Sequence, residues 1–371
     1  MVFKEAFEHY KTGNATPEEI TYVENELEKS RLISEYLEED FEVNLEAETA
    51  PADELKNVKR SLRKRSRNII AISVAVVFVL ALLANFAAVP LLNKLYYNPM
   101  TKENDPYSYD IDFSLAAYTE LHQAGYSYGS TLVENTGIGK YAMTLIRNDL
   151  STGNQEYLTA ALYKNNLTMP YSFTTGNLSA NIFARASYPV YNLDPQNKEN
   201  FIKKLKNLPD YIGVTAAVSF SKDLTMGQLL DMMTGSKVSF LWTGIRNAPE
   251  NIQRYPLCGM DLTATGIVYE QINNKYPAFE LAAIHSDEGT FRAADYETHF
   301  TSLLQYSIDH ADFLKALNAD ASYYPSVLDY VKKNGVKTYG VLVRGPAAEI
   351  LALMDTGIVS QIWPLDADVG F

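Results

Sequence analysis

The stretch VKTYGVLVRGPAAEILALMDTGIVSQIWPLD, residues 336–366, decides the fold of the C-terminal part of this 371-residue chain. Its first ten residues are rich in Val and Leu and carry a Tyr, which favours a β-strand. Pro346 then suits the first position of a helix, and Gly357 suits its end. Another apolar run, GIVSQIWPLD, follows the glycine. The stretch therefore predicts a strand, a helix and a second strand.

The same order of elements is predicted earlier in the chain. A strand over Tyr211–Ser221 is followed by a helix from Asp223 to about Gly235, and then by a strand over Lys237–Ile245. Two such units separated by an insertion indicate a split βαβ, ferredoxin-like sheet. The insertion is predicted to be helical over residues 296–333. Its inward-facing apolar residues would be Leu303, Leu304, Ile308, Leu314 and Leu317.

The sequence before this region indicates a β-rich subdomain over residues 93–199. The runs YAMTLIRND (141–149), EYLTAALY (156–163) and ASYPVYNLD (186–194) alternate with turn-forming residues, and one or two short helices are expected among them. Together with a domain over residues 200–371, this predicts an α+β fold. A single cysteine, Cys258, excludes an internal disulfide framework, so the stability must come from an apolar core.

Residues 69–92, IIAISVAVVFVLALLANFAAVPLL, contain no charged side chain and are predicted to form one transmembrane helix. The preceding segment, residues 56–68, carries seven basic and no acidic residues. By the positive-inside rule this end would stay in the cytoplasm. We therefore expect a single-pass protein of the cell membrane, with its N-terminus cytoplasmic and residues 93–371 extracellular, and with the lipid bilayer as one partner.

The predicted cytoplasmic region, residues 1–55, is strongly acidic. It holds sixteen acidic and four basic residues, within a net charge of -13 for the whole chain. So dense a negative charge excludes direct binding to nucleic acid and suits a basic protein surface. A solvated acidic tail without a partner is the simpler alternative.

Two short amphipathic helices are predicted in this acidic region. One covers Val2–Lys11, and the other begins at Thr16, where TPEE has the pattern of a capping box with a proline at the first helical position. Gly13 and Asn14 would form the turn between them. Two such helices bury too little surface to be very stable alone, so they either pack together with help or fold against a partner. The apolar positions that would contact it are Phe7, Ile20, Val23, Leu27, Ile33 and Leu37.

No catalytic motif stands out, so the sequence predicts neither an enzyme nor a cofactor. The run His285-Ser286-Asp287-Glu288 lacks the context of a nucleophile elbow, and His299 and His310 are too far apart for a helical metal pair. A groove for glycan or lipid head groups remains a second possibility. It would be lined by tyrosines with tryptophans, namely Tyr107, Tyr109, Tyr126, Tyr128, Trp242 and Trp363.

The N-terminal pattern, an aromatic helix, a turn and then TPEEITYVENELEKS, resembles the N-terminal domain of membrane-bound anti-sigma factors. Many members of that group carry the zinc motif His-x3-Cys-x2-Cys on this helix. The aligned positions here are Glu26, Ser30 and Ile33, and none offers a thiolate or an imidazole. No metal site is therefore expected.

The C-terminal half resembles the sigma factor regulator C-terminal domain of Firmicute anti-sigma factors. The resemblance rests on LPDYIGVTAAVSFSKDLTMGQLLDMM, on VSFLWTGI, and on the closing strand and helix around Gly345-Pro346. The apolar stretch with its basic lead, up to about Asp149, is similar to the regulator's N-terminal domain. Zinc-less anti-sigma factors of extracytoplasmic-function sigma factors are thus the group that this chain resembles.

This resemblance implies an anti-sigma factor. The inner helices would sequester an extracytoplasmic-function sigma factor, and the outer domain would sense the state of the envelope. Release would follow proteolysis, an altered contact, or the action of a second membrane protein. The alternative is a signal-anchored protein for cell-wall binding or envelope assembly, in which the N-terminal region is only an anchor. An extracellular hydrolase is a third hypothesis.

Overall fold

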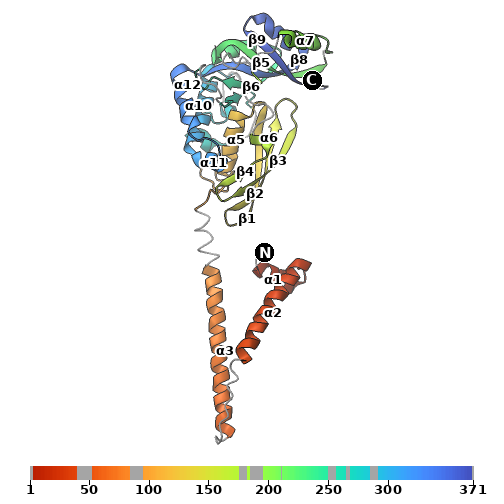
Figure 1. Cartoon of the computed structure of the whole chain (residues 1–371). Helices are drawn as coiled ribbons and strands as arrows, with labels where there is room; N and C mark the ends of the chain where they lie inside the picture. Colours follow the sequence, from red (N-terminus) through yellow and green to blue (C-terminus); the bar gives the residue numbers. More distant parts are fainter. Residues whose placement is uncertain are drawn as a thin grey trace. The chain divides into compact units, whose positions relative to one another are not determined.

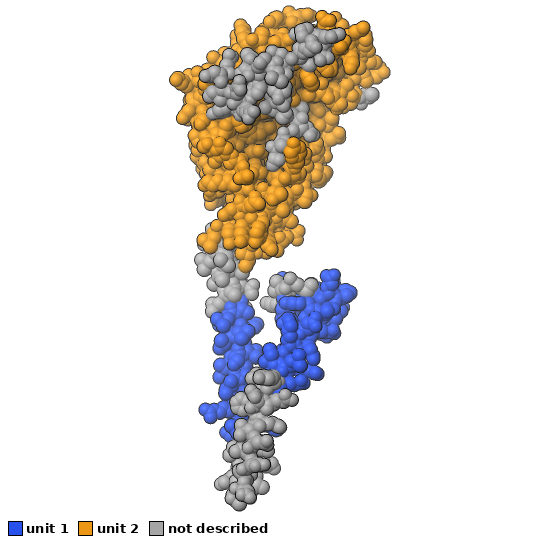
Figure 2. Space-filling view, in the orientation of Figure 1, with its two compact units in different colours: residues 1–81 blue, residues 82–371 orange. Residues whose placement is uncertain are grey.

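Two compact units, residues 1–81 and residues 82–371, make up the chain (Figure 2). The computed structural model describes residues 3–39, 52–83, 95–174, 182–183, 195–209, 211–249, 256–264, 268–284 and 291–369. The finer division that we predicted, with boundaries at residues 55, 68, 92 and 199, stays a prediction.

The first unit is helical. Helix α1 (Phe3–Thr12) and helix α2 (Pro17–Glu39) form a hairpin whose turn contains Gly13 at φ +74°. The capping box is present, because the Thr16 hydroxyl accepts from the Glu19 N–H at 3.3 Å and Glu19 Oε2 accepts from the Thr16 N–H at 2.8 Å. A long helix, α3 (Ala52–Leu83), follows and contains the basic segment, residues 56–68.

The transmembrane helix predicted over residues 69–92 is wrong. Among the helices in the described ranges, none combines the length and the apolar character that crossing a membrane requires. The described part of the predicted span, residues 69–83, is the end of α3. Residues 84–92 lie outside the described residues.

The second unit is α+β, as expected, and contains two antiparallel sheets (Figure 1). The first sheet is a meander in the order β1-β2-β3-β4. Its strands are β1 (Tyr126–Gly137), β2 (Lys140–Asp149), β3 (Gln155–Tyr163) and β4 (Asn166–Thr168). Strands β2 and β3 are where YAMTLIRND and EYLTAALY predicted them, whereas ASYPVYNLD lies outside the described residues. Helix α5 (Asp110–His122), longer than expected, packs on β1, and α6 (Tyr171–Thr174) follows β4.

The second sheet has the order β7-β6-β8-β5-β9, with every neighbouring pair antiparallel. Its strands are β5 (Ile212–Thr225), β6 (Ser239–Ile245), β7 (Gly259–Asp261), β8 (Lys337–Pro346) and β9 (Val359–Val369). Strand β8 lies between β5 and β6, and β5 lies between β8 and β9. This confirms the split βαβ arrangement, with the short β7 added at its edge.

Helices cover this sheet and fill the insertion. Helix α8 (Met226–Thr234) and helix α13 (Ala347–Ala352), which continues into the 3-10 turn Leu353–Thr356, pack on the central strands β5 and β8. Helix α7 (Pro195–Lys206) packs on α13. The insertion holds α9 (Glu270–Lys275), a 3-10 turn at Leu281–Ala283, α10 (Ala293–Asp309), α11 (Ala311–Ala316) and α12 (Tyr323–Asn334).

One apolar core joins both sheets. It runs from α5 and the meander through α10 and α12 to the inner face of the second sheet, where alternate residues such as Val214, Val341 and Val343 are buried. The predicted inward residues Leu303, Leu304, Leu314 and Leu317 are buried, and Ile308 packs against the same core. Both sheets therefore hold α5 and α10 in place.

Candidate functional site

The predicted contact residues of the helical hairpin divide into buried and exposed ones. Val23 is buried together with Ala6 where α1 packs on α2, and Phe7 is half-buried and stacked on Phe3 at 5.4 Å. Ile20 is also half-buried. Leu27 and Ile33 are 45% and 60% exposed. Leu37 lies on α2, but its side chain is outside the description.

The exposed part of α2 combines apolar and acidic side chains. Leu32 is exposed next to Ile33. The few basic side chains here are engaged with glutamates of the same helix. Lys29 Nζ lies 2.6 Å from Glu26, and Arg31 lies 3.5 Å from both Glu28 and Glu35. Exposed ion pairs of this kind add little to stability, so the net effect is an acidic surface with apolar side chains in it.

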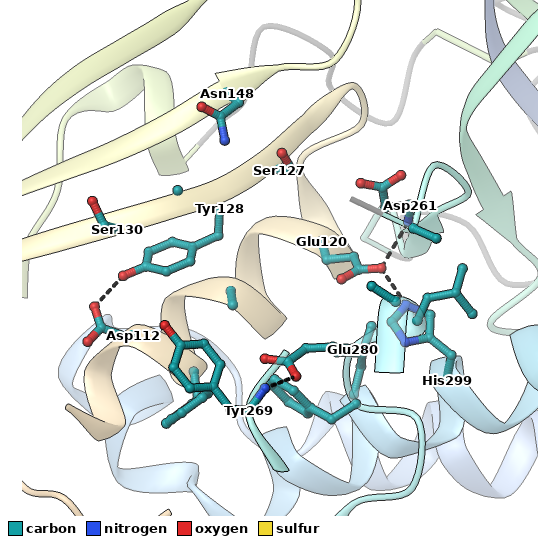
Figure 3. A pocket seen from close by; sticks show the side chains of 18 of the residues that line it. Asp112, Glu120, Ser127, Tyr128, Ser130, Asn148, Asp261, Tyr269, Glu280 and His299 are labelled. Carbon is teal, nitrogen blue, oxygen red and sulfur yellow. Dashed lines mark hydrogen bonds and ion pairs between the residues drawn. The ribbon is translucent and has the colours of Figure 1, made fainter. Parts of the chain in front are cut away.

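A second candidate site is a cavity of about 400 Å³ within the unit of residues 82–371. Helix α5 forms one wall, β1 a second, and α10 with the segment around Glu280 the others (Figure 3). The face of α5 that borders it carries Asp112, Ala116 and Glu120, four residues apart, which places all three on one side of the helix.

Glu120 and His299 form the buried centre of the site. Glu120 Oε1 lies 2.5 Å from His299 Nε2 and accepts from the Asp261 N–H at 3.1 Å. His299 Nδ1 lies 2.7 Å from the Ala278 carbonyl oxygen, which can only accept, so Nδ1 carries a proton. Burial lowers the pKa of His299, but the charge and hydrogen bond of Glu120 outweigh it and raise this pKa overall.

Two further carboxyl groups beside this pair hold their protons unusually tightly. Burial, assisted by the charge of Glu120, raises the pKa of Asp261 to about 7. Burial likewise raises the pKa of Glu280 to about 7. Asp261 Oδ1 accepts from the Thr263 N–H at 2.6 Å, and Glu280 Oε2 accepts from the Tyr269 N–H at 2.8 Å. Groups with pKa values displaced this far are often found in functional sites.

The far end of the cavity is formed by Tyr128 and Asp112, whose hydroxyl and carboxyl groups are hydrogen-bonded. Burial raises the pKa of Asp112. A bulge between Tyr128 and Ser130 interrupts the pairing of β1 with β2 at Gly129. A side chain at Gly129 would begin 2.9 Å from the Ile146 carbonyl oxygen, so the close approach of the two strands requires glycine.

The structure does not bring the predicted aromatic groove together. Of those side chains only Tyr128 borders the cavity. Tyr107 is fully exposed, Tyr126 is buried over the Arg147 guanidinium at 3.8 Å, and Trp242 is buried with its indole N–H donating to the Glu120 carbonyl at 2.8 Å. Trp363 lies on β9 and packs on Phe201.

The histidines have structural partners. His310 lies at the C-terminal end of α10, stacked on Tyr306 at 3.9 Å, and does not border the cavity that His299 lines. The run 285–288 lies outside the described residues. Within the described ranges, no group of three or more His, Cys, Asp or Glu side chains is arranged to hold a metal ion.

Comparison with known proteins bears on both sites. Residues 205–362 match the family described as sigma factor regulator C-terminal. The chain is also 24% identical over 377 residues to the probable anti-sigma-M factor YhdL of Bacillus subtilis (strain 168), covering 95% of this chain and 94% of that protein. These two matches make the chain similar to anti-sigma factors and their regulator domains. No solved structure matches.

The cavity draws on more than the segment that matches the family. Asp261, Glu280 and His299 lie within residues 205–362, whereas Asp112, Glu120 and Tyr128 precede them. Sequence reasoning missed the carboxyl groups. The sequence did carry one signal for these groups. In an otherwise apolar segment, Asp112, Ala116 and Glu120 follow one another at intervals of four residues, which places them on one face of a helix.

Proposed function

We propose that this protein is an anti-sigma factor that sequesters an extracytoplasmic-function sigma factor through its N-terminal helices. The match to a probable anti-sigma-M factor over 95% of the chain carries the proposal, because it extends far beyond the C-terminal domain. Binding, without catalysis, accounts for this activity.

The hairpin has the chemistry that such a contact needs. The exposed side chains of Leu27, Leu32 and Ile33 would be anchors buried on binding. The glutamates around them would face the basic surfaces with which a sigma factor contacts DNA, and would raise the rate of association. Val23 is already buried between α1 and α2, so its role is to hold the hairpin together unless the hairpin opens on binding.

The unit of residues 82–371 would be the regulatory part. Its matched family is a regulator domain, and its cavity offers a place where a signal could be received. A change in this unit would then weaken the hold of the helices on the sigma factor, by cleavage of the chain or through a second protein.

We also propose that the protein is associated with a membrane. Apolar side chains on the second half of α3, such as Val77 and Phe78, are exposed and suit contact with lipid. Flotation of the purified protein with lipid vesicles tests this, and failure of the protein to float with any vesicle would contradict it.

The sigma-binding proposal is tested by capture. The full chain is immobilised and offered the purified sigma factors of the same cell one at a time, and transcription by polymerase with the retained factor is measured with and without the chain. We expect one extracytoplasmic-function sigma factor to be retained and its transcription to fall. If none is retained and no promoter is affected, the proposal is wrong.

A further inference from the structure

The 400 Å³ cavity has more negative groups than its own residues neutralise. Its wall carries the carboxyl groups of Asp112, Glu120, Asp261 and Glu280, with His299 as the one basic side chain among the lining residues. Glu120 is paired with His299, and Asp112 with the hydroxyl of Tyr128. Asp261 and Glu280 form no ion pair within the described residues.

Each of these two carboxyl groups uses only one oxygen within the described part of the chain. Asp261 Oδ1 takes both donors of Thr263, the N–H at 2.6 Å and the hydroxyl at 2.7 Å. Asp261 borders the cavity with only 7% of its surface exposed, and Oδ2 has no hydrogen-bond donor among the described residues. Oδ2 is not among the fully buried polar atoms that lack a partner, so it is open to the cavity and can accept from a ligand there.

The remaining wall is aromatic. Phe113 makes edge contacts with Tyr269 at 5.2 Å and with Phe279 at 6.1 Å, and all three border the cavity. Ring faces attract cations and also cover methylene groups. A ligand matched to such walls carries a positive charge on an apolar stem.

A metal ion fits less well than an organic cation. The carboxyl groups border the cavity without converging, and within the described residues no three ligating side chains are arranged for a metal. An ammonium group has three N–H donors that point in different directions and can reach acceptors set apart from one another. Figure 3 shows the Asp261, Glu120 and Glu280 carboxyl groups around one end of the cavity.

We propose that this cavity binds a small protonated amine. The ammonium group donates to Asp261 Oδ2 and to the carboxylates of Glu120 and Glu280, and the carbon chain lies against Phe113 and Tyr269. This ligand site goes beyond sigma binding. The experiment below measures binding of the amine directly, so its result does not depend on whether the chain binds a sigma factor.

The experiment titrates the full chain at pH 8 by calorimetry with 1,5-diaminopentane as the probe. The matched neutral probe is 1,5-pentanediol, which has the same length and no charge. We expect the diamine to bind at least tenfold more tightly than the diol. Equal binding of the two, or tighter binding of Ca²⁺ that competes with the diamine, would overturn the proposal.

Two variants locate the site. Glu280→Gln removes a charge and keeps an oxygen for the Tyr269 and Asn273 donors, while Ala116→Leu fills the cavity from α5 without changing its charge. Each should weaken diamine binding at least tenfold. Asp312→Asn, at a side chain that is 81% exposed, is the control and should leave binding unchanged. If both folded variants bind as wild type, the amine does not bind here. If one variant does not fold, the other carries the test.

Discussion

Replacing Asp261 with Asn should make the stability of the protein less dependent on pH. Asn retains an oxygen that accepts from the N–H and hydroxyl of Thr263, so the local hydrogen bonds survive. What it removes is a carboxyl group that is buried beside Glu120, where burial and that charge raise the pKa of Asp261 to about 7 from 3.8. The perturbation is therefore almost purely one of charge.

The sign follows from proton binding. Between pH 3.8 and pH 7 the folded wild type holds a proton on Asp261 that the unfolded chain has lost, so stability falls as the pH rises. The stability from this proton is fully present below pH 3.8 and is lost once the pH passes 7. Two pH units, from 5 to 7, at about 1.4 kcal/mol each amount to roughly 3 kcal/mol. The interaction of Asp261 with Glu120 and the entry of water into the site reduce this change in the free energy of unfolding to about 1.5–3 kcal/mol.

The assay is thermal unfolding of the full chain and of Asp261→Asn at pH 5 and pH 8. The Tm of the variant minus that of the wild type should be higher at pH 8 than at pH 5 by about 5 °C, taking roughly 2–4 °C per kcal/mol for a domain of this size. Asp312→Asn serves as the control and should show the same difference at both pH values. A Tm difference for Asp261→Asn that does not change with pH would refute the account of the buried carboxyl group.

Three further substitutions test other parts of the structure. Arg147→Met removes a buried guanidinium that donates to Glu156 at 2.7 Å. Because the Glu156 carboxylate is partly exposed and can bind water instead, we expect the free energy of unfolding, measured by denaturant titration, to fall by about 1–3 kcal/mol. Gly340→Ala places a methyl group 2.7 Å from the Val218 carbonyl oxygen, across the pairing of β5 with β8. Such overpacking costs about 1–3 kcal/mol, so we expect a Tm lower by several degrees. Thr16→Ala breaks the capping box of α2 and should reduce the stability of the hairpin by about 1 kcal/mol. Amide hydrogen exchange in residues 17–39 measures this, and unchanged exchange rates would contradict a stabilising role for the cap.

The split βαβ sheet could be predicted because its signals are local. Pro346 and Gly357 mark the ends of the helical segment that joins β8 to β9, and the flanking apolar runs are long enough to be buried strands. The capping box at Thr16 is equally local, and it is present as predicted.

The cavity could not be predicted in the same way. Glu120 and His299 are 179 residues apart, and they meet only because α5 and α10 pack between the two sheets. The four-residue spacing of Asp112, Ala116 and Glu120 was readable, but nothing local says that this face of the helix borders a cavity. The transmembrane prediction over residues 69–92 rests on hydrophobicity alone, and no helix in the described ranges is both long and apolar enough to cross a membrane.

The central claim, that the N-terminal helices hold a sigma factor, is tested most directly by the Kd of the full chain for the sigma factor that it retains. The double variant Leu27→Glu with Ile33→Glu removes two exposed apolar anchors from α2. The control is Leu132→Glu, the same change at a 66% exposed leucine of β1. With about 2 kcal/mol lost for each anchor, the account predicts a Kd at least 100-fold weaker for the double variant and an unchanged Kd for the control. A double variant that still binds with the wild-type Kd would contradict the account.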